Sequence, residues 1–255
     1  MGFPLAVGRR TRANGKATMG HQAKVGTGPG VITPDGCAVD FYALLPPMGE
    51  PEIIAAAVPP GASILELGCG TGRLLEPLAG MGHPVLGVDE SAAMLDRIPG
   101  LPTVLSSIET LDLGRTFDVV LLASNMINTF PAQRRAFLAS CGRHVAPDGL
   151  VIFCQQPPDW FATLRSGDQR DVEGIGYTVR SVAQDGASVR VSVEYQVGDR
   201  RWTHAFAMHR ISPEERDADL ASAGLRFGWW LTHDRAWFTA RPVEGRGGGP
   251  AQGPM

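Results

Sequence analysis

Residues 64–96, "ILELGCGTGRLLEPLAGMGHPVLGVDESAAMLD", decide the fold and narrow the choice of ligand. A short apolar strand runs into a turn in which Gly68, Gly70 and Gly72 alternate with other residues. A turn with so few side chains lets the backbone approach a ligand closely. A second apolar strand then ends on Asp89, a carboxylate placed to accept the hydroxyls of a ribose. The stretch therefore predicts a nucleoside-containing ligand at the ends of two strands.

The spacing of the glycines separates this turn from one that binds a dinucleotide. A dinucleotide turn needs glycines at its first, third and sixth positions, with a pyrophosphate on the helix that follows. Counting from Gly68, the sixth position is Arg73, and the glycines follow a one-three-five pattern instead. Glu66, at the strand end, would repel a pyrophosphate but suits a ligand that carries an ammonium group. A ribose with a cationic amino-acid tail and no pyrophosphate fits S-adenosylmethionine.

The formal net charge of −3 is unevenly distributed, with +5 in residues 1–33 and −8 in the rest of the 255-residue chain. So acidic a body is a poor match for phosphate backbones, and no nucleic-acid partner is expected. The basic, glycine-rich start predicts a disordered tail over 1–33, and the low-complexity end predicts another over 244–255. Residues 34–243 are left as one cofactor-binding domain.

The sequence also indicates a compartment and excludes some kinds of site. It has no run of eighteen apolar residues and no signal-peptide core at its start, so we expect no membrane partner and a cytoplasmic location. The four cysteines are scattered without the spacing of metal ligands, and no metal site is expected.

Strands and helices alternate from residue 63 to residue 155. Strands are expected at 63–67, 84–89, 102–107, 117–124 and 150–155, with helices at 72–82, 90–98 and 131–145. The segment 117–124, "FDVVLLAS", is apolar on both faces, as a central parallel strand should be. Such alternation predicts an α/β, Rossmann-like, mostly parallel sheet with helices on both faces. Two short helices precede the first strand, each followed by a proline pair.

After residue 155 the pattern changes to antiparallel strands. "ASVRVSVEYQV", residues 187–197, alternates apolar and polar positions between two turn dipeptides. With a strand before it and one after, it predicts a three-stranded meander over 172–210, inserted before the last helix. That helix is expected at 212–224, and two closing strands bring the main sheet to seven.

The pair of motifs "ILELGCGTG" and "VDESAAML" resembles those of the class I S-adenosylmethionine-dependent methyltransferases. The resemblance covers roughly residues 37–240 and implies the sheet predicted above, with S-adenosylmethionine as cofactor. The cofactor-binding residues that it implies are Tyr42, Glu66, Gly68, Cys69, Gly70, Asp89, Glu90, Met94, Ser107, Ile108, Ala123, Ser124 and Asn125.

The resemblance also assigns these residues to parts of the cofactor. The first-motif residues from Glu66 to Gly70 would surround the methionine portion, and Asp89 would hold the ribose. Glu90, Met94 and Ile108 would lie at the adenine. Ser107 stands where relatives commonly carry an acid for the adenine amino group, so this sequence departs from the pattern there. Ala123, Ser124 and Asn125 would border both the cofactor and the mouth of the acceptor site, and Tyr42 would close over the cofactor.

No catalytic residue is fixed by the sequence, but Asn128 and His204 are candidates. Asn128 follows a buried strand, where an asparagine either faces a pocket or bonds loop backbone. His204 shares a strand face with Trp202, Phe206 and Met208. It is either a hydrogen-bonded histidine in an apolar layer or a proton acceptor on a lid over the substrate.

The predicted function is methyl transfer by in-line displacement to a small-molecule acceptor, at oxygen or nitrogen, typical of secondary metabolism. The Asn/Asp-Pro-Pro-aromatic motif of enzymes that methylate nucleobases or amides is replaced by Ser124 to Ile127. Two alternatives stay open: an enzyme that uses the cofactor for cyclisation or transfer of another group, and a non-catalytic cofactor-binding subunit. The sequence is compatible with a monomer or a homodimer.

Overall fold

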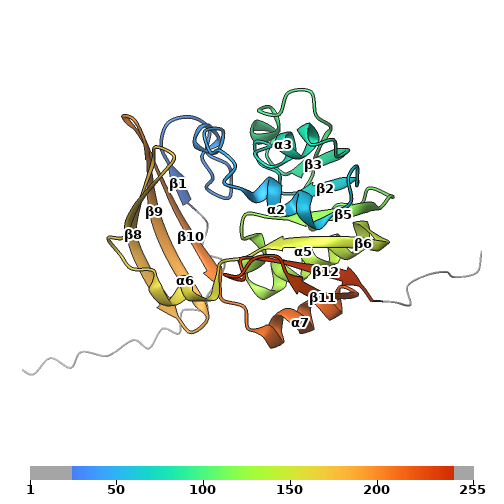
Figure 1. The fold of residues 1–255 in the computed structure, drawn as a ribbon. Helices are drawn as coiled ribbons and strands as arrows, with labels where there is room; N and C mark the ends of the chain where they lie inside the picture. The colour runs from blue at the N-terminus through green and yellow to red at the C-terminus, as the bar shows by residue number, and fades with distance from the viewer. Residues whose placement is uncertain (1–24, 244–255) are drawn as a thin grey trace, which may run out of the picture.

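The computed structural model describes residues 25–243, which fold as two sheets facing each other (Figure 1). The larger one, the main sheet, has seven strands in the order β11-β12-β6-β5-β2-β3-β4. Its strands are β2 (Ile64–Leu67), β3 (Val85–Asp89), β4 (Thr103–Leu105), β5 (Phe117–Leu122), β6 (Val145–Cys154), β11 (Leu225–Trp230) and β12 (Trp237–Pro242). The strands β2 to β6 are parallel, while β12 and β11 add an antiparallel edge. The predicted seven-stranded, mostly parallel α/β sheet is confirmed.

Helices cover both faces of the main sheet, because alternate residues of its strands are apolar on both sides. In β2, Leu65 and Leu67 pack with α5 (Pro131–His144) and α7 (Pro213–Ser222). Ile64 packs on the other side with α2 (Glu50–Ala57) and α3 (Leu75–Gly80). The remaining helical segments are α1 (Val39–Tyr42), α4 (Ala92–Leu95), η1 (Met126–Asn128) and α6 (Pro158–Thr163). Neither η1 nor α6 was predicted.

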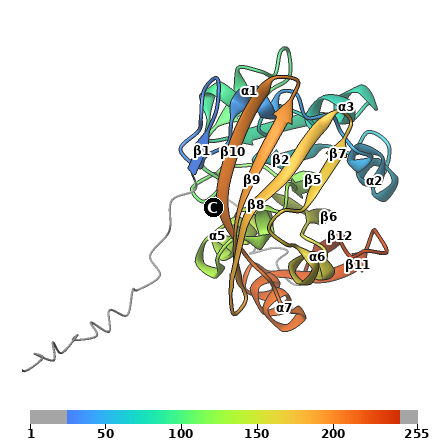
Figure 2. The same cartoon turned by 90° about the vertical axis from the view of Figure 1, so that its left-hand side faces the viewer.

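The second sheet, here called the cover sheet, has five strands in the order β1-β10-β9-β8-β7. They are β1 (Val25–Thr27), β7 (Gln169–Val172), β8 (Ile175–Asp185), β9 (Ser188–Val197) and β10 (Arg200–His209). All neighbouring strands of the cover sheet are antiparallel. The cover sheet lies across the end of the main sheet at which the parallel strands have their carboxyl ends (Figures 1 and 2). The predicted three-stranded meander corresponds to β8, β9 and β10 at the centre of the cover sheet. The structure adds β7 at one edge and β1 at the other.

The prediction of a disordered tail over 1–33 is wrong from residue 25 onward. Val25 to Thr27 pair with β10, and the indole nitrogen of Trp202 donates a hydrogen bond of 2.9 Å to the carbonyl of Pro29. The glycines here serve close packing: a Cβ on Gly28 would come within 2.3 Å of the Trp202 ring. The segment docks through backbone hydrogen bonds, which its glycine-rich composition does not reveal. Residues 1–24 and 244–255 lie outside the described part of the chain, so the tail predictions there are untested.

Candidate active site

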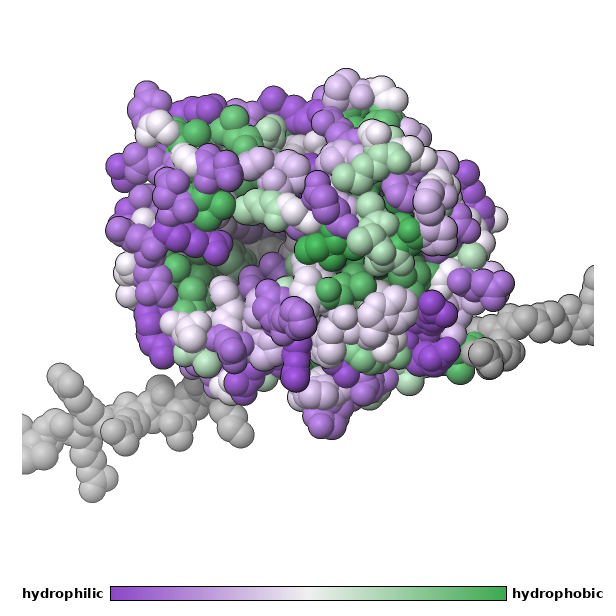
Figure 3. Space-filling view, viewed as in Figure 1, coloured by the Kyte–Doolittle hydropathy of each residue, from purple (hydrophilic) through white to green (hydrophobic). Residues whose placement is uncertain are grey.

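A cavity of about 640 Å³ lies between the carboxyl ends of the parallel strands and the inner face of the cover sheet. Figure 3 shows the molecular surface hollowed between the two sheets. In open α/β sheets, ligands bind outside the carboxyl ends of the strands. The cavity therefore lies where the sequence places the cofactor, and the cover sheet forms its opposite wall.

The glycine turn and Asp89 form one preorganised unit on the cavity wall. Gly68 and Gly70 have φ angles of 72° and 55°, in the left-handed region that favours glycine. The backbone N–H of Gly70 donates to one Asp89 carboxylate oxygen at 2.9 Å, and that of Ser91 donates to the other at 2.9 Å. A Cβ built on Gly70 meets nothing within 4 Å, so the turn leaves open space for a ligand. The Asp89 carboxylate is thus held in place to accept ribose hydroxyls.

Glu66 is a buried acid facing the same cavity. Its exposed fraction is 3%, and burial, reinforced by the nearby Asp89, raises the pKa of its carboxyl to about 8. The oxygen Oε2 has no hydrogen-bond partner among the described residues. A buried polar atom without a partner is costly unless a ligand satisfies it. The ammonium group of S-adenosylmethionine would satisfy it, so the site fits this cofactor.

Most of the predicted cofactor residues line the cavity. Those that do are Tyr42, Glu66, Gly68, Cys69, Gly70, Asp89, Glu90, Met94, Ile108, Ser124 and Asn125. Ala123 does not, since its side chain is packed in the core below the site with Leu121. Ser107 does not either: its hydroxyl donates a 2.6 Å hydrogen bond to Glu109. Glu109 itself lines the cavity, so the acid that relatives carry at the position of Ser107 is here replaced by one two residues later in the chain.

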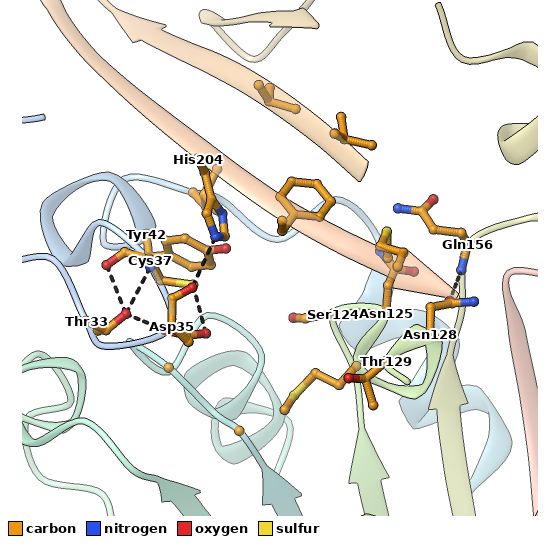
Figure 4. A pocket seen from close by; sticks show the side chains of 18 of the residues that line it. Thr33, Asp35, Cys37, Tyr42, Ser124, Asn125, Asn128, Thr129, Gln156 and His204 are labelled. Atoms are coloured by element: carbon orange, nitrogen blue, oxygen red, sulfur yellow. Dashed lines mark hydrogen bonds between the residues drawn. The ribbon is translucent and has the colours of Figure 1, made fainter. Parts of the chain in front are cut away.

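Both catalytic candidates line the cavity, at opposite ends (Figure 4). His204 is 7% exposed, and its Nε2 lies 3.3 Å from the backbone carbonyl of Asp35. Because a carbonyl only accepts, Nε2 is the donor in this contact. Asn128 is 2% exposed, and its amide bonds two backbone groups, the carbonyl of His209 and the N–H of Gln156.

Sequence reasoning missed Thr33, Asp35 and Cys37 as cavity residues: Thr33 was assigned to the tail over 1–33, and Asp35 and Cys37 were given no role in the domain. In this turn the Thr33 hydroxyl donates to the Asp35 carboxylate and accepts a 2.9 Å bond from the Cys37 N–H. Burial, followed by the neighbouring Cys37, raises the pKa of Tyr42 well above its ordinary value. The dipeptides Thr-Pro and Asp-Gly at 33–36 are turn signals that would have marked an ordered loop here.

Comparisons with known proteins agree with this geometry. The family described as "Methyltransferase domain" matches residues 64–149. The chain is 33% identical to a dTDP-3-amino-3,6-dideoxy-alpha-D-glucopyranose N,N-dimethyltransferase of Streptomyces fradiae, over 66% of this chain and 71% of the relative. The chain belongs to the class I S-adenosylmethionine-dependent methyltransferases. This methyltransferase is also 26% identical to a dTDP-4-amino-2,3,4,6-tetradeoxy-D-glucose N,N-dimethyltransferase of Saccharopolyspora spinosa, over 69% of this chain and 76% of the relative.

A solved structure extends the comparison to the whole fold. An S-adenosylmethionine-bound amino pentose methyltransferase from Micromonospora echinaspora is 28% identical, with a TM-score of 0.61. The alignment covers 82% of the methyltransferase described here and 93% of that chain. The predictions of S-adenosylmethionine as cofactor and of enzymatic methyl transfer to a small molecule are confirmed. Within residues 25–243, no helix is both long and apolar enough to cross a membrane.

Proposed function

We propose that this methyltransferase transfers its methyl group to the amine nitrogen of a small molecule held between the two sheets. The observation that carries the proposal is the charge of the cavity wall. Its acidic residues are Asp35, Glu66, Asp89, Glu90, Glu109 and Asp168, and its arginines are Arg73 and Arg170. A wall with this excess of acids favours a cationic amine group in the cavity.

The two arginines already have contacts within the protein. Arg73 forms a 2.6 Å ion pair with Glu50, and this pair is largely shielded from solvent. The guanidinium of Arg170 lies 4.7 Å from the centre of the Tyr177 ring. Arg73 still acts on Glu66, whose pKa it lowers against the effect of burial, so it offsets part of the acidic charge near the glycine turn. Six acids against two arginines nevertheless leave the cavity wall acidic as a whole.

The shape and polarity of the cover-sheet wall favour an amino sugar with few hydroxyls. Its side chains in the cavity include Val179, Val191, Val193, Phe206 and Met208, which suit deoxygenated ring carbons. Two relatives are named as N,N-dimethyltransferases of amino-deoxy sugars, and the similar solved structure is named as an amino pentose methyltransferase. We therefore assign an amino-deoxy sugar as the acceptor class.

The chemistry of the step comes from the cofactor, which presents a methyl group on a sulfonium. When bound, the cofactor would supply this methyl group to the amine lone pair, with the neutral thioether as leaving group, so the amine must first lose its proton. His204 lines the cavity and is our candidate for accepting the ammonium proton. Holding the amine in line with the methyl group is the other task of the cavity, and orientation of this kind removes about 7–11 kcal/mol of barrier.

Product analysis tests the proposal. The purified protein would be incubated with methyl-labelled S-adenosylmethionine and three acceptors: a nucleotide-linked amino-deoxy sugar, the same sugar without its nucleotide, and the matching sugar with a hydroxyl in place of the amine. We expect S-adenosylhomocysteine and an N-methylated product from an amine-bearing acceptor. The first two acceptors show whether the nucleotide is needed. Methylation of the hydroxyl analogue, with the amines unreacted, would overturn the assignment to nitrogen.

A further inference from the structure

Within residues 25–243 the chain passes between the two sheets three times, from β1 to β2 and at two further points that lie close together. The chain leaves the main sheet after β6, at Gln155 and Gln156, and returns from the cover sheet at His209, the last residue of β10. On the main-sheet side, the exit is fixed by the Gln155 N–H, which donates to the Ala236 carbonyl at 2.8 Å. The return is followed directly by α7, whose first turn is closed by Ser212.

One buried side chain bonds to both crossings. The Nδ2 of Asn128 donates to the carbonyl of His209 at 3.1 Å, and its Oδ1 accepts from the N–H of Gln156 at 2.8 Å. Figure 4 shows the Asn128 amide beside Gln156 at the far end of the cavity from His204. The side chain is 2% exposed, so both bonds are shielded from water. A primary amide is suited to this position because it supplies a donor and an acceptor at once.

The turn that carries Asn128 also forms part of the cofactor side of the cavity. Ser124 and Asn125, just before η1, both have positive φ angles, 54° and 58°. These two residues line the cavity, and Asn128 follows them after one turn of helix. Consecutive left-handed residues that are not glycine persist where the surrounding structure fixes them. The geometry therefore connects the turn at Ser124 and Asn125, through one amide, to two of the three points where the chain passes between the sheets.

We propose that Asn128 is a positioning residue that sets the cover sheet at a fixed distance from the cofactor wall and so sets the width of the acceptor site. Strand β10 brings His204, Phe206 and Met208 to the cavity and ends at His209, the residue that Asn128 holds. Loosening this bond frees the end of β10 that carries Phe206 and Met208 to the cavity. That the cavity beside β10 holds the methyl acceptor rests on the proposed function. The link that Asn128 makes between the two sheets does not depend on it.

The test compares three variants of the full-length protein. Asn128→Asp keeps an acceptor for the Gln156 N–H but loses the donor and sets a carboxylate oxygen against the His209 carbonyl. Asn128→Ser, which is smaller, replaces it if the first variant does not fold. Asn125→Asp is a matched change on the same turn, because Asn125 bonds Cys154 within the main-sheet part and makes neither crossing bond. The measurements are hydrogen exchange over 169–209, calorimetric affinity for S-adenosylmethionine, and KM and kcat for the acceptor.

For Asn128→Asp we expect exchange over 169–209 to speed up by roughly tenfold, the effect of one lost buried hydrogen bond with an unsatisfied carbonyl. We expect the acceptor KM to rise by a similar factor, with the cofactor affinity and kcat near those of the parent. Asn125→Asp should leave exchange over 169–209 unchanged. Unchanged exchange in Asn128→Asp, or a fall in kcat without a change in KM, would overturn the proposal. Hydrogen exchange and calorimetry need no acceptor, so these two measurements test the role of Asn128 even if no amine is methylated.

Discussion

The buried carboxyl of Glu66 should make the stability of the protein depend on pH. In the folded protein, burial raises the pKa of its carboxyl from 4.5 to about 8. The folded state therefore holds a proton that the unfolded state has lost, and stability falls as the pH rises from 4.5 through about 8. At 1.36 kcal/mol per pKa unit, the full effect is on the order of 4–5 kcal/mol. Glu66→Gln keeps the neutral shape, so it should be the more stable protein above pH 8 and nearly equal at pH 5.

Binding of S-adenosylmethionine should reverse this protonation. An ammonium group against Glu66 favours the carboxylate, so binding at pH 6.5 should release close to one proton from the protein. At that pH the cofactor's own α-amino group is already protonated and adds little to the proton count. Titration calorimetry in two buffers with different ionisation enthalpies measures the release, because the observed heat differs by the number of protons taken up by the buffer.

The variant Glu66→Gln is the control for this proton release. Glu66→Gln should show no buffer-dependent heat that can be assigned to this position, so the difference between the two proteins isolates one carboxyl from the others in the cavity. Affinity of the parent protein should also rise with pH, by up to about tenfold per unit below pH 8. If the parent and Glu66→Gln release the same number of protons on binding, Glu66 does not meet the ammonium group.

Three further predictions concern other parts of the site. Asp89→Ala should weaken S-adenosylmethionine binding by about 1.5–3 kcal/mol, the value of a charge-assisted hydrogen bond, and calorimetry showing parental affinity would remove the ribose assignment. His204→Ala should lower the rate of methyl transfer at unchanged cofactor affinity; if the variant melts early but its folded fraction turns over normally, His204 serves packing alone. Removing residues 1–33 should lower the melting temperature and shift Trp202 fluorescence to the red, because that side chain is only 1% exposed. Removing residues 1–24 leaves β1 intact and is the matched control.

The parts of the site that the sequence predicts are those held within short stretches of chain. The glycine turn and Asp89 stand at the ends of neighbouring strands, β2 and β3, and their hydrogen bond joins residues nineteen apart. A motif records such a unit, because its spacing is set by one strand-helix-strand connection. The alternation of strands and helices likewise predicts the main sheet, since each element shows its own periodicity.

What the sequence does not predict depends on packing between distant segments. Asp35 reaches His204 only because β1 pairs with β10, and no local pattern announces a strand of three residues rich in glycine. The bonds of Asn128 are of the same kind: the side chain was predicted as either a pocket residue or a backbone partner. Its partners at Gln156 and His209 become visible only once the cover sheet is in place.

The bond between Trp202 and Pro29 also bears on the order in which the protein folds. These residues are 173 positions apart, so the contact cannot form until nearly the whole chain has left the ribosome. Strands β2 and β3 pair over about twenty residues and can assemble much earlier. During synthesis, strands β2 and β3 with the glycine turn can therefore form first, and the chamber, meaning the cavity enclosed between the two sheets, forms last. The early segment β1 stays unpaired until β10 has been made, so the wall of the chamber that they share is completed late in synthesis.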